Sequence, residues 1–403
     1  MKILQVTPVF KPLWESGGIA RAAYEISRSL AERGHDVTVY TTNRSLYNTN
    51  LPTNKVLYLE GMKVYYFENL RKYFPAKNPP PPLPYYLPFI ARKEIKQFDV
   101  IHIHDYRTML AVIIHHYAKK YNIPYVLQPR GSLPRISKSK QKQLFDALFG
   151  WAIINDASKI IASSKIESEQ YLDVFNDIDL EKVVHIPNGI DLETYQNLPK
   201  KGEFRRKYSI AEDKKVILFL SRIHKRKGAD FLIEAFNKLK NELEGVKLVI
   251  AGPDVGYLDK LKLIVNKLNI EDDVIFPGPL YEKDKLEAYV DADVFVLPSK
   301  DRYESFGNVV LEACACDTPV IVTNNCGVSE WMINDGGRYL VECVECNKIQ
   351  IYNVLYKILT DEDKRKHMSK YAKKFVRKFS WGNIIQKYEM VYKSLANYKE
   401  KHH

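Results

Sequence analysis

Short apolar runs alternate with amphipathic stretches of helical length along almost the whole chain. The apolar runs have the pattern of buried strands, and the stretches between them repeat apolar residues at helical spacing. Alternation of this kind predicts the α/β fold class, in which helices cover sheets of parallel strands.

The predicted strands form two series, and a stretch rich in proline, glycine and charge, Pro187–Lys207, lies between them. Because 403 residues exceed what one ordinary core accommodates, we expect two domains with a hinge in this stretch. The first series is Ile3–Val6, Val37–Thr41, Val64–Phe67, Val100–His104, Tyr125–Gln128, Ile160–Ala162 and Val183–Ile186. The second series is Val216–Leu220, Lys247–Ala251, Val274–Phe276, Val294–Leu297 and Val320–Thr323. Expected helices include Ile19–Arg33, Met109–Tyr121, Ala229–Leu239, Ile349–Thr360, Asp363–Phe379 and Trp381–Tyr398.

The composition is that of a globular protein, with 45% hydrophobic, 12% aromatic and 27% charged residues. No stretch approaches the roughly 18 uninterrupted apolar residues of a transmembrane helix. Met1 and Lys2 lead directly into a strand, which leaves no room for the apolar region of a signal peptide. We therefore expect a cytoplasmic protein.

The formal net charge is +12, and lysines and arginines recur in short stretches. Solvated helix faces explain most such stretches. The alternative is attraction to an anionic ligand, a lipid phosphate or an acidic membrane, so peripheral contact with the inner face of a membrane stays open. No nucleic-acid-binding motif accompanies the charge, so nucleic acid is not an expected partner. The basic stretches are Arg71–Lys77, Arg92–Lys96, Lys138–Lys142, Lys200–Lys207 and Lys364–Lys378.

Metal sites are not favoured by the sequence. Cys343 and Cys346 have metal-ligand spacing, but Cys314 and Cys316 point in different directions on an apolar helix, so free thiols are expected in place of zinc. Three acidic pairs resemble metal-diphosphate motifs, yet they lie in polar surface contexts or where a helix changes to a strand. These pairs are Asp177–Asp179, Asp291–Asp293 and Asp361–Asp363.

The most informative segment is Glu304–Glu312, which has a carboxylate at each end. It follows the predicted strand Val294–Leu297 and enters an apolar helical run, which is where α/β proteins bind anions. Eight helical positions span about 12 Å, wider than the roughly 5–9.5 Å between the two carboxylates of a glycosidase. The spacing fits the two ends of an extended ligand with a central phosphate, such as a nucleotide-sugar.

A basic loop, Ser221–Gly228, lies between the predicted strand Val216–Leu220 and the helix Ala229–Leu239. Its crowded lysines and arginines occupy the edge where α/β proteins bind ligands, and an anion would neutralise them. Arg222 offers a bidentate contact to phosphate oxygens, and Lys227 offers a point charge. A solvated basic turn is the alternative.

The first half of the chain contains weaker signals. Gly17 and Gly18 open a helix, where the backbone can approach a ligand closely, although a plain turn explains them equally well. No G-x-G-x-x-G pattern accompanies them, so NAD and FAD are not expected. His104 ends a predicted strand and is a candidate for a cleft, and Arg130 follows another strand and could meet an anionic group. A structural ion pair is the alternative for Arg130.

Together these features resemble the retaining glycosyltransferases of the GT-B fold, family 4. The resemblance implies two Rossmann-like domains facing across a cleft: residues 1–195 for the acceptor and 196–379 for the nucleotide-sugar. Residues 380–403 would form a helix that returns to the N-terminal domain. The resemblance covers nearly the whole chain and rests on Gly17-Gly18, His104, Pro187–Asp191, Arg222 with Lys227-Gly228, Glu304 with Glu312, Ala292–Ser299 and Thr318–Val320.

The resemblance also implies residue roles. Arg222 and Lys227 would bind the diphosphate, Glu304 the hydroxyls of the transferred sugar, and Glu312 those of the ribose. The expected catalytic residues are Arg222, Lys227, Glu304 and His104, with Arg130 expected at the acceptor. Backbone groups of Ser305, Phe306, Gly307 and Asn308 would meet the diphosphate from one side, and those of Gly17 and Gly18 from the other.

The expected reaction moves a hexose from a nucleotide-diphosphate sugar to a hydroxyl of a glycan, lipid or small-molecule acceptor, with retention and without a metal or other cofactor. A nucleotide-sugar epimerase and a non-catalytic nucleotide-sugar-binding protein are the alternatives. Two positions depart from the family pattern. Asp317 stands where a glycine is usual before Thr-Pro, and Asn324–Gly327 replaces a Gly-Gly loop.

Overall fold

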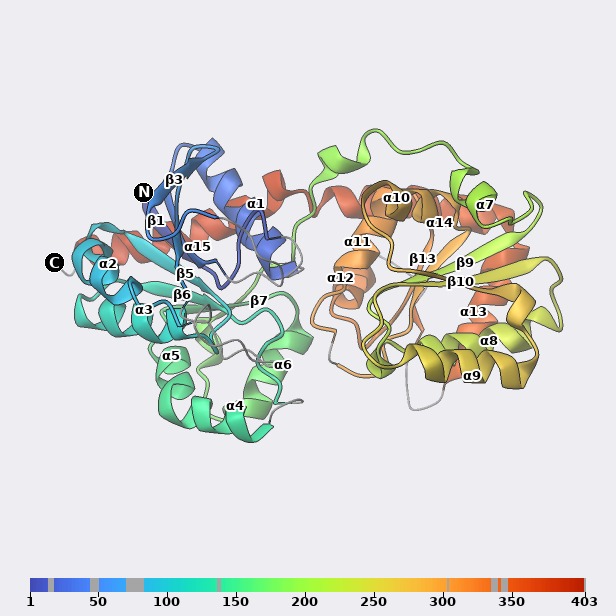
Figure 1. Cartoon of the computed structure of the whole chain (residues 1–403), viewed down its shortest axis with the longest axis horizontal. Helices are drawn as coiled ribbons and strands as arrows, with labels where there is room; N and C mark the ends of the chain where they lie inside the picture. Colours follow the sequence, from blue (N-terminus) through green and yellow to red (C-terminus); the bar gives the residue numbers. More distant parts are fainter. Residues whose placement is uncertain are drawn as a thin grey trace. The chain divides into compact units, whose positions relative to one another are not determined.

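The computed structural model consists of two compact units, Met1–Gly189 with Trp381–His403 (unit 1) and Ile190–Ser380 (unit 2). It describes residues 1–13, 18–43, 51–69, 83–135, 139–302, 304–334, 340–341 and 347–401. Each unit is built on a sheet of mainly parallel strands with helices packed against it (Figure 1). The predicted α/β fold class is therefore confirmed.

Unit 1 contains an eight-stranded sheet in the order β3-β4-β2-β1-β5-β6-β7-β8. The seven strands predicted for this half are all present and pair in parallel. The additional strand β3 is antiparallel to β4 at one edge of the sheet. Its sequence, Val-Leu-Tyr-Leu, is apolar although its residues are exposed or only half-buried, and the strand is missing from the predicted series. The strands are β1 (Lys2–Val6), β2 (Asp36–Thr42), β3 (Val56–Leu59), β4 (Met62–Phe67), β5 (Val100–His104), β6 (Tyr125–Gln128), β7 (Lys159–Ala162) and β8 (Val183–His185).

Helices cover both faces of this sheet, since successive side chains of each strand point to opposite sides. Leu4 of β1 joins a core enclosed by α2, α3 and α5, whereas Ile3 joins a core enclosed by α1 and α15. The C-terminal helix α15 therefore packs on the first domain, as the resemblance implied. The helices are α1 (Gly18–Glu32), α2 (Leu87–Glu94), α3 (Met109–Lys120), α4 (Ser139–Phe145), the π-helical turn η4 (Asp146–Gly150), α5 (Trp151–Asn155), α6 (Lys165–Val174) and α15 (Trp381–Lys401).

The helix α15 is attached to unit 1 by packing and by charge. Trp381 lies so close to Gly189 that a Cβ on the glycine would be 2.5–2.8 Å from the indole ring. Further along, buried Glu389 accepts hydrogen bonds from Arg33 at 2.7 and 3.0 Å and lies 2.9 Å from the His35 ring nitrogen. The hydrogen bonds from Arg33 lower the pKa of Glu389 to about 2.

Unit 2 contains a six-stranded, wholly parallel sheet in the order β11-β10-β9-β12-β13-β14. The five predicted strands are present, and the two-residue strand β14 is too short to predict from an apolar run. The strands are β9 (Lys215–Leu220), β10 (Val246–Ala251), β11 (Val274–Gly278), β12 (Val294–Leu297), β13 (Val320–Thr323) and β14 (Leu340–Val341). The helices are α7 (Glu203–Lys207), α8 (Ala229–Lys240), α9 (Leu258–Leu268), α10 (Glu282–Asp291), α11 (Asn308–Ala315), α12 (Val328–Asn334), α13 (Lys348–Thr360) and α14 (Glu362–Arg377).

The strand order reverses once in each of the two sheets. In unit 2, β10 and β11 lie on one side of β9, while β12 and β13 lie on the other. In unit 1 the same reversal separates β1 from β5. Doubly wound α/β proteins bind ligands beside the carboxyl ends of the strands at such a reversal.

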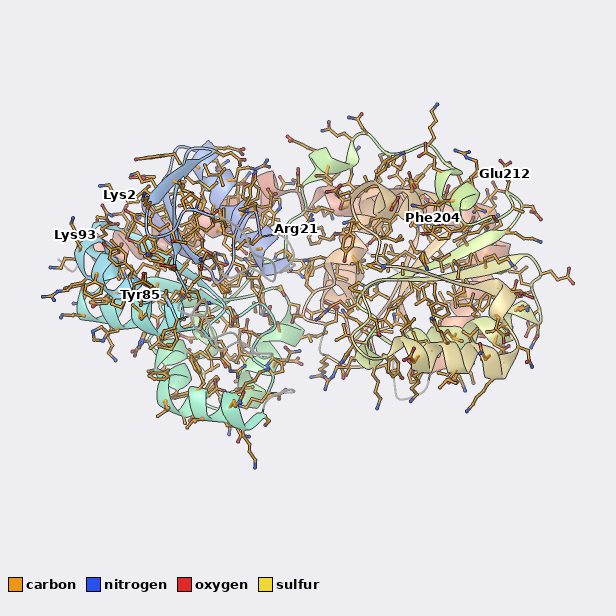
Figure 2. All side chains as sticks on the ribbon, viewed as in Figure 1. Lys2, Arg21, Tyr85, Lys93, Phe204 and Glu212 are labelled. Atoms are coloured by element: carbon orange, nitrogen blue, oxygen red, sulfur yellow. The ribbon has the colours of Figure 1, made fainter. Side chains whose placement is uncertain are left out.

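The outer surfaces of the units carry many charged side chains. Lys93 of α2 projects away from unit 1, whereas Phe204 of α7 is buried against the unit 2 sheet (Figure 2). Across the described ranges, we find no helix that combines the length and apolar character needed to cross a membrane.

We expect Glu389→Gln to lower the free energy of unfolding of unit 1 by about 3 kcal/mol at neutral pH. The folded pKa of about 2 lies below the ordinary 4.5, so this contribution is complete above pH 4.5 and is lost as the pH falls toward 2. Urea unfolding of the wild type and of Glu389→Gln across this pH range measures the difference between their free energies of unfolding. This difference should shrink as the pH falls. Glu32→Gln is the control, because its exposed carboxylate lies 3.6 Å from Arg28 and should contribute under about 0.5 kcal/mol. A pH-independent difference would contradict the ionic attachment.

Candidate functional site

The basic loop of unit 2 connects the carboxyl end of β9 to the start of α8. It contains a single 3₁₀ turn, η7 (Lys225–Lys227), and ends at Gly228, whose φ of +75° favours glycine. A Cβ on Gly228 would overlap the carbonyl oxygen of Pro298, the first residue after β12. A glycine is therefore needed for the two loops at the strand-order reversal to approach each other.

The second loop of the site leads from β12 to α11 and carries Glu304. Its last residue, Gly307, has φ +99°, and a Cβ there would lie 2.6 Å from the Cys326 sulfur. The carbonyl of Glu304 accepts a hydrogen bond from Gly327 N–H (3.0 Å), and that of Phe306 accepts one from Val328 N–H (2.7 Å). The loop that departs from the Gly-Gly pattern thus holds the backbone of the Glu304 loop in place.

Side chains from these two loops are in contact. The Lys227 ammonium is paired with the Glu304 carboxylate, and both groups are largely buried. The backbone N–H of Lys300 donates to the carbonyl of Arg226 (2.9 Å), and the Arg226 guanidinium pairs with Asp301 (3.0 Å). The structure thus brings together Lys227 and Glu304, which the sequence predicts as donor-site residues.

A buried carboxylate in the first turn of α8 adds a further connection that the sequence did not reveal. Asp230 accepts from Lys300 Nζ (2.5 Å) and from the Tyr257 hydroxyl (2.9 Å). The Lys300 ammonium also lies 3.7 Å from the centre of the Phe231 ring. Asp230 and Lys300 are 70 residues apart, and no motif connects them, so only the packing of α8 beside the loop after β12 shows the pair.

Arg222 differs from Lys227 in its surroundings. It lies two residues after the end of β9, its side chain is exposed, and it makes no hydrogen bond or ion pair with any residue that the structure describes. Its guanidinium is thus available for a bidentate contact with an anion.

The second glutamate of the pair, Glu312, lies on α11 and faces α10. Its carboxylate accepts from the Tyr289 hydroxyl (3.1 Å) and pairs with Lys285 (3.0 Å). The side chain is still partly exposed, at 21%. A hydroxyl that approached Glu312 would therefore meet a carboxylate whose orientation Lys285 and Tyr289 already determine.

In unit 1, His104 lies at the carboxyl end of β5 but is buried. Its Nε2 lies 2.7 Å from the Gln5 side-chain oxygen, and its Nδ1 accepts from Arg130 Nε at 3.1 Å. Burial lowers the pKa of both His102 and His104 well below the ordinary value, and the two rings are 3.9 Å apart. A neutral His104 with both ring nitrogens engaged must give up one of these bonds before it can contact a sugar.

Arg130 has a strained backbone conformation, with φ +53°. Besides His104, it contacts the Asn188 side-chain oxygen at 3.5 Å, and it forms no ion pair within the described ranges of the chain. The expected contact with an acceptor remains a prediction. Gly18 begins α1 and is exposed, whereas Gly17 lies outside the described residues.

The acidic pairs considered as metal ligands have structural partners. Asp291 accepts from the backbone N–H groups of Gly202 (2.5 Å) and Arg205 (3.0 Å), and Asp361 caps α14. The described part of the chain contains no group of three or more His, Cys, Asp or Glu residues arranged to hold a metal ion.

The cysteines within the described residues are buried free thiols. Burial raises the pKa of Cys316 to about 12 and raises those of Cys314 and Cys326 as well. Cys343 and Cys346 lie outside the described residues.

Two Rossmann-like units, each built on a mainly parallel sheet with one reversal of strand order, are the architecture of the GT-B glycosyltransferases. Residues 16–194 match the family description Glycosyltransferase Family 4, and residues 200–375 match Glycosyl transferases group 1. The chain belongs to this family of retaining glycosyltransferases, enzymes that take a sugar from a nucleotide-sugar donor.

Two sequence relatives and one solved structure match nearly the whole length of the chain. An uncharacterized glycosyltransferase of Methanocaldococcus jannaschii is 28% identical, with 98% of each chain covered. A D-inositol 3-phosphate glycosyltransferase of Xylanimonas cellulosilytica is 26% identical over 94% of this chain and 93% of its own. The crystal structure of Anabaena HepE in complex with UDP and glucose has a TM-score of 0.74 at 20% identity, with 98% of this chain and all of that chain covered. The epimerase and the non-catalytic binding protein find no support among these matches.

We expect Gly228→Ala to destabilise unit 2 by more than about 3 kcal/mol, because the new methyl group meets a backbone oxygen and the φ angle is unfavourable. Gly256→Ala is the matched control: its φ is +81°, but nothing lies within 4 Å of the added Cβ. That variant should lose only about 1 kcal/mol. Thermal and urea unfolding compare the two. Equal losses would show that backbone strain, and not the contact with Pro298, makes glycine necessary.

Proposed function

We propose that this enzyme transfers a hexose from a nucleotide-diphosphate sugar to a hydroxyl group of a glycan, lipid or small-molecule acceptor, and that it needs no metal ion. The contact between Lys227 and Glu304 at the strand-order reversal of unit 2 carries the proposal. One loop offers cations for a diphosphate, and the other offers a carboxylate for sugar hydroxyls. The start of α11 follows directly and adds the partial positive charge of a helix N-terminus.

In this proposal the donor replaces contacts that the free protein makes with itself. The diphosphate binds the side chains of Arg222 and Lys227 and accepts hydrogen bonds from backbone N–H groups between Ser305 and Asn308. Once Lys227 turns to the phosphates, Glu304 is released to orient the hydroxyls of the hexose. Glu312, already oriented by Lys285 and Tyr289, binds the hydroxyls of the ribose.

The chemistry follows from where charge develops during transfer. As the bond between the sugar and the diphosphate breaks, negative charge grows on the phosphate, and Arg222, Lys227 and the α11 terminus stabilise it. The departing phosphate oxygen then accepts the proton of the attacking hydroxyl. Glu304 orients the sugar and does not attack it. Cations and a helix end perform the role that a divalent metal has in other transferases.

Residues 1–195 bind the acceptor in this proposal, and residues 196–379 bind the donor. Gly17 and Gly18 approach the diphosphate from the acceptor side, while His104 and Arg130 contact the sugar or the acceptor. Contact through His104 requires its bonds to Gln5 and Arg130 to rearrange. The neighbour solved with UDP and glucose makes a UDP-hexose the first donor to test.

We expect Arg222→Ala and Lys227→Ala each to lower kcat/KM by about 10²–10³-fold, because each removes a charge that stabilises the departing diphosphate. Lys225→Ala in the same loop is the matched control, since its exposed side chain has no assigned role. It should retain near-normal activity. Circular dichroism and melting temperature confirm folding of all three. Near-normal transfer by both the Arg222 and the Lys227 variants would refute the proposed phosphate site.

A donor panel tests the function itself. We expect one of UDP, GDP and ADP to raise the melting temperature by mass action, and the matching sugar to be consumed in the presence of acceptors. Addition of a chelator should leave the rate unchanged. Formation of an epimeric nucleotide-sugar without an acceptor would instead indicate an epimerase. Binding without turnover across a broad acceptor panel would indicate a binding protein.

A further inference from the structure

A surface of unit 1 outside the candidate site exposes four large apolar side chains. Leu144 and Leu148 are each 62% exposed, Phe149 is 37% exposed and Trp151 is 38% exposed. They lie on the continuous helical segment 139–155, formed by α4, η4 and α5, of which α4 forms the lower edge of unit 1 in Figure 1. We call this segment the basic-apolar ridge. Clustered exposed apolar side chains mark a surface that binds a partner or a membrane.

The inner face of the basic-apolar ridge is hydrogen-bonded to the rest of unit 1 through Asp146. The helical segment therefore cannot rotate to bury its exposed apolar side chains. The buried carboxylate of Asp146 accepts hydrogen bonds from the Tyr106 hydroxyl (2.9 Å) and from Arg107 Nη2 (2.8 Å). Arg135 Nε donates to the same carboxylate at 2.8 Å. Gly150 packs so closely that a Cβ would lie 2.8 Å from an Asp146 oxygen. The exposed face is therefore a fixed property of the fold.

The stretch of chain that leads into this face is rich in cations. Residues 106–145 contain eight lysines and arginines and not one aspartate or glutamate. Some of these cations are already engaged: Arg107 and Arg135 pair with Asp146, and Lys119 pairs with Asp156. Lys140 on α4 is exposed next to the apolar residues. The eight cations are Arg107, Lys119, Lys120, Arg130, Arg135, Lys138, Lys140 and Lys142.

We propose that the basic-apolar ridge docks this enzyme on the surface of a lipid bilayer that contains anionic headgroups. A helical segment with exposed leucine, phenylalanine and tryptophan and with nearby lysines lies in the plane of the bilayer interface. Its apolar side chains enter the boundary between headgroups and acyl chains. Tryptophan favours that depth, and the lysines are attracted by the negative surface potential. A bilayer therefore matches both the apolar and the basic character of this surface.

The other partners that could bind the ridge match either its apolar side chains or its positive charge, but not both. A symmetric contact with a second copy would place the same cations opposite one another. A nucleic acid would match the charge, but it would leave Leu144 and Leu148, the two most exposed of the four apolar side chains, without an apolar partner. The inference does not depend on the identity of the donor or on the proposed phosphate site.

Cosedimentation of the full-length protein with lipid vesicles tests the proposal. We expect binding to phosphatidylcholine vesicles that contain phosphatidylglycerol, and much weaker binding to phosphatidylcholine alone. Binding should fall in about 1 M NaCl, where the Debye length is about 3 Å. The double variant L144S/L148S should bind at least about tenfold more weakly, since each leucine loses its apolar burial. Lys140→Glu should also weaken binding, by several-fold.

Leu263→Ser is the matched control, because Leu263 is 59% exposed on α9 of unit 2 and lies outside the ridge. It should bind vesicles as the wild type does. Trp151 fluorescence should shift to the blue on binding, and Trp151→Phe should abolish most of that shift. An unchanged circular dichroism spectrum and melting temperature of L144S/L148S show that this variant is folded.

Three results would overturn the proposal: no binding to anionic vesicles, equal binding by L144S/L148S and the Leu263 control, or unchanged binding in high salt. If light scattering showed a wild-type dimer that L144S/L148S converts to a monomer, the ridge would be an interface between two copies. Failure of this experiment leaves the donor panel unaffected, so the two proposals can fail separately.

Discussion

The approach of Gly228 to the carbonyl of Pro298 is the constraint on which the candidate site depends. It brings the loops after β9 and β12 together where the strand order of unit 2 reverses. Because Gly228 has no side chain, the start of α8 can lie directly against the loop after β12. Lys227 can then reach Glu304, and Lys300 can reach Asp230. A cationic loop and a carboxylate-bearing loop thereby become one site.

Within that site, the largely buried charges are paired before any ligand arrives. Lys227 is paired with Glu304, and Glu312 is paired with Lys285, whereas Arg222 is exposed. Pairing explains how a crowded basic loop stays folded, because an unpaired buried charge would be costly. In the proposed donor complex, an anionic donor would exchange one set of ionic contacts for another. The net affinity for the donor then depends on how much more favourable its contacts are than the ion pairs that they replace.

In unit 1, the corresponding strand end carries a neutral histidine beside one arginine. At the carboxyl end of β5, His104 is buried, uncharged and bonded to Gln5 and Arg130. The helix α15 covers this side of the sheet, and its Tyr392 hydroxyl lies 2.7 Å from the His102 ring. The C-terminal segment is therefore part of the first domain's core. Much of the positive charge of unit 1 lies in residues 106–145, where the basic-apolar ridge begins.

The sequence alone determined the order and position of most elements, because a strand buried on both faces requires a local apolar run. It predicted twelve strands correctly but missed the two-residue β14 and also β3, an apolar edge strand whose residues are exposed or only half-buried. It also located Arg222 and Lys227 on the loop after one strand and Glu304 on the loop after another, which are the loops after β9 and β12 in the structure; their roles toward a donor stay a prediction. Only the tertiary structure decided which side chains meet. Lys227 and Glu304 are 77 residues apart, and Asp230 and Lys300 are 70 apart, so their contacts exist only because β9 and β12 lie side by side. The burial of His104 was likewise decided by packing, since a residue at a strand end can face solvent or the interior with the same sequence pattern.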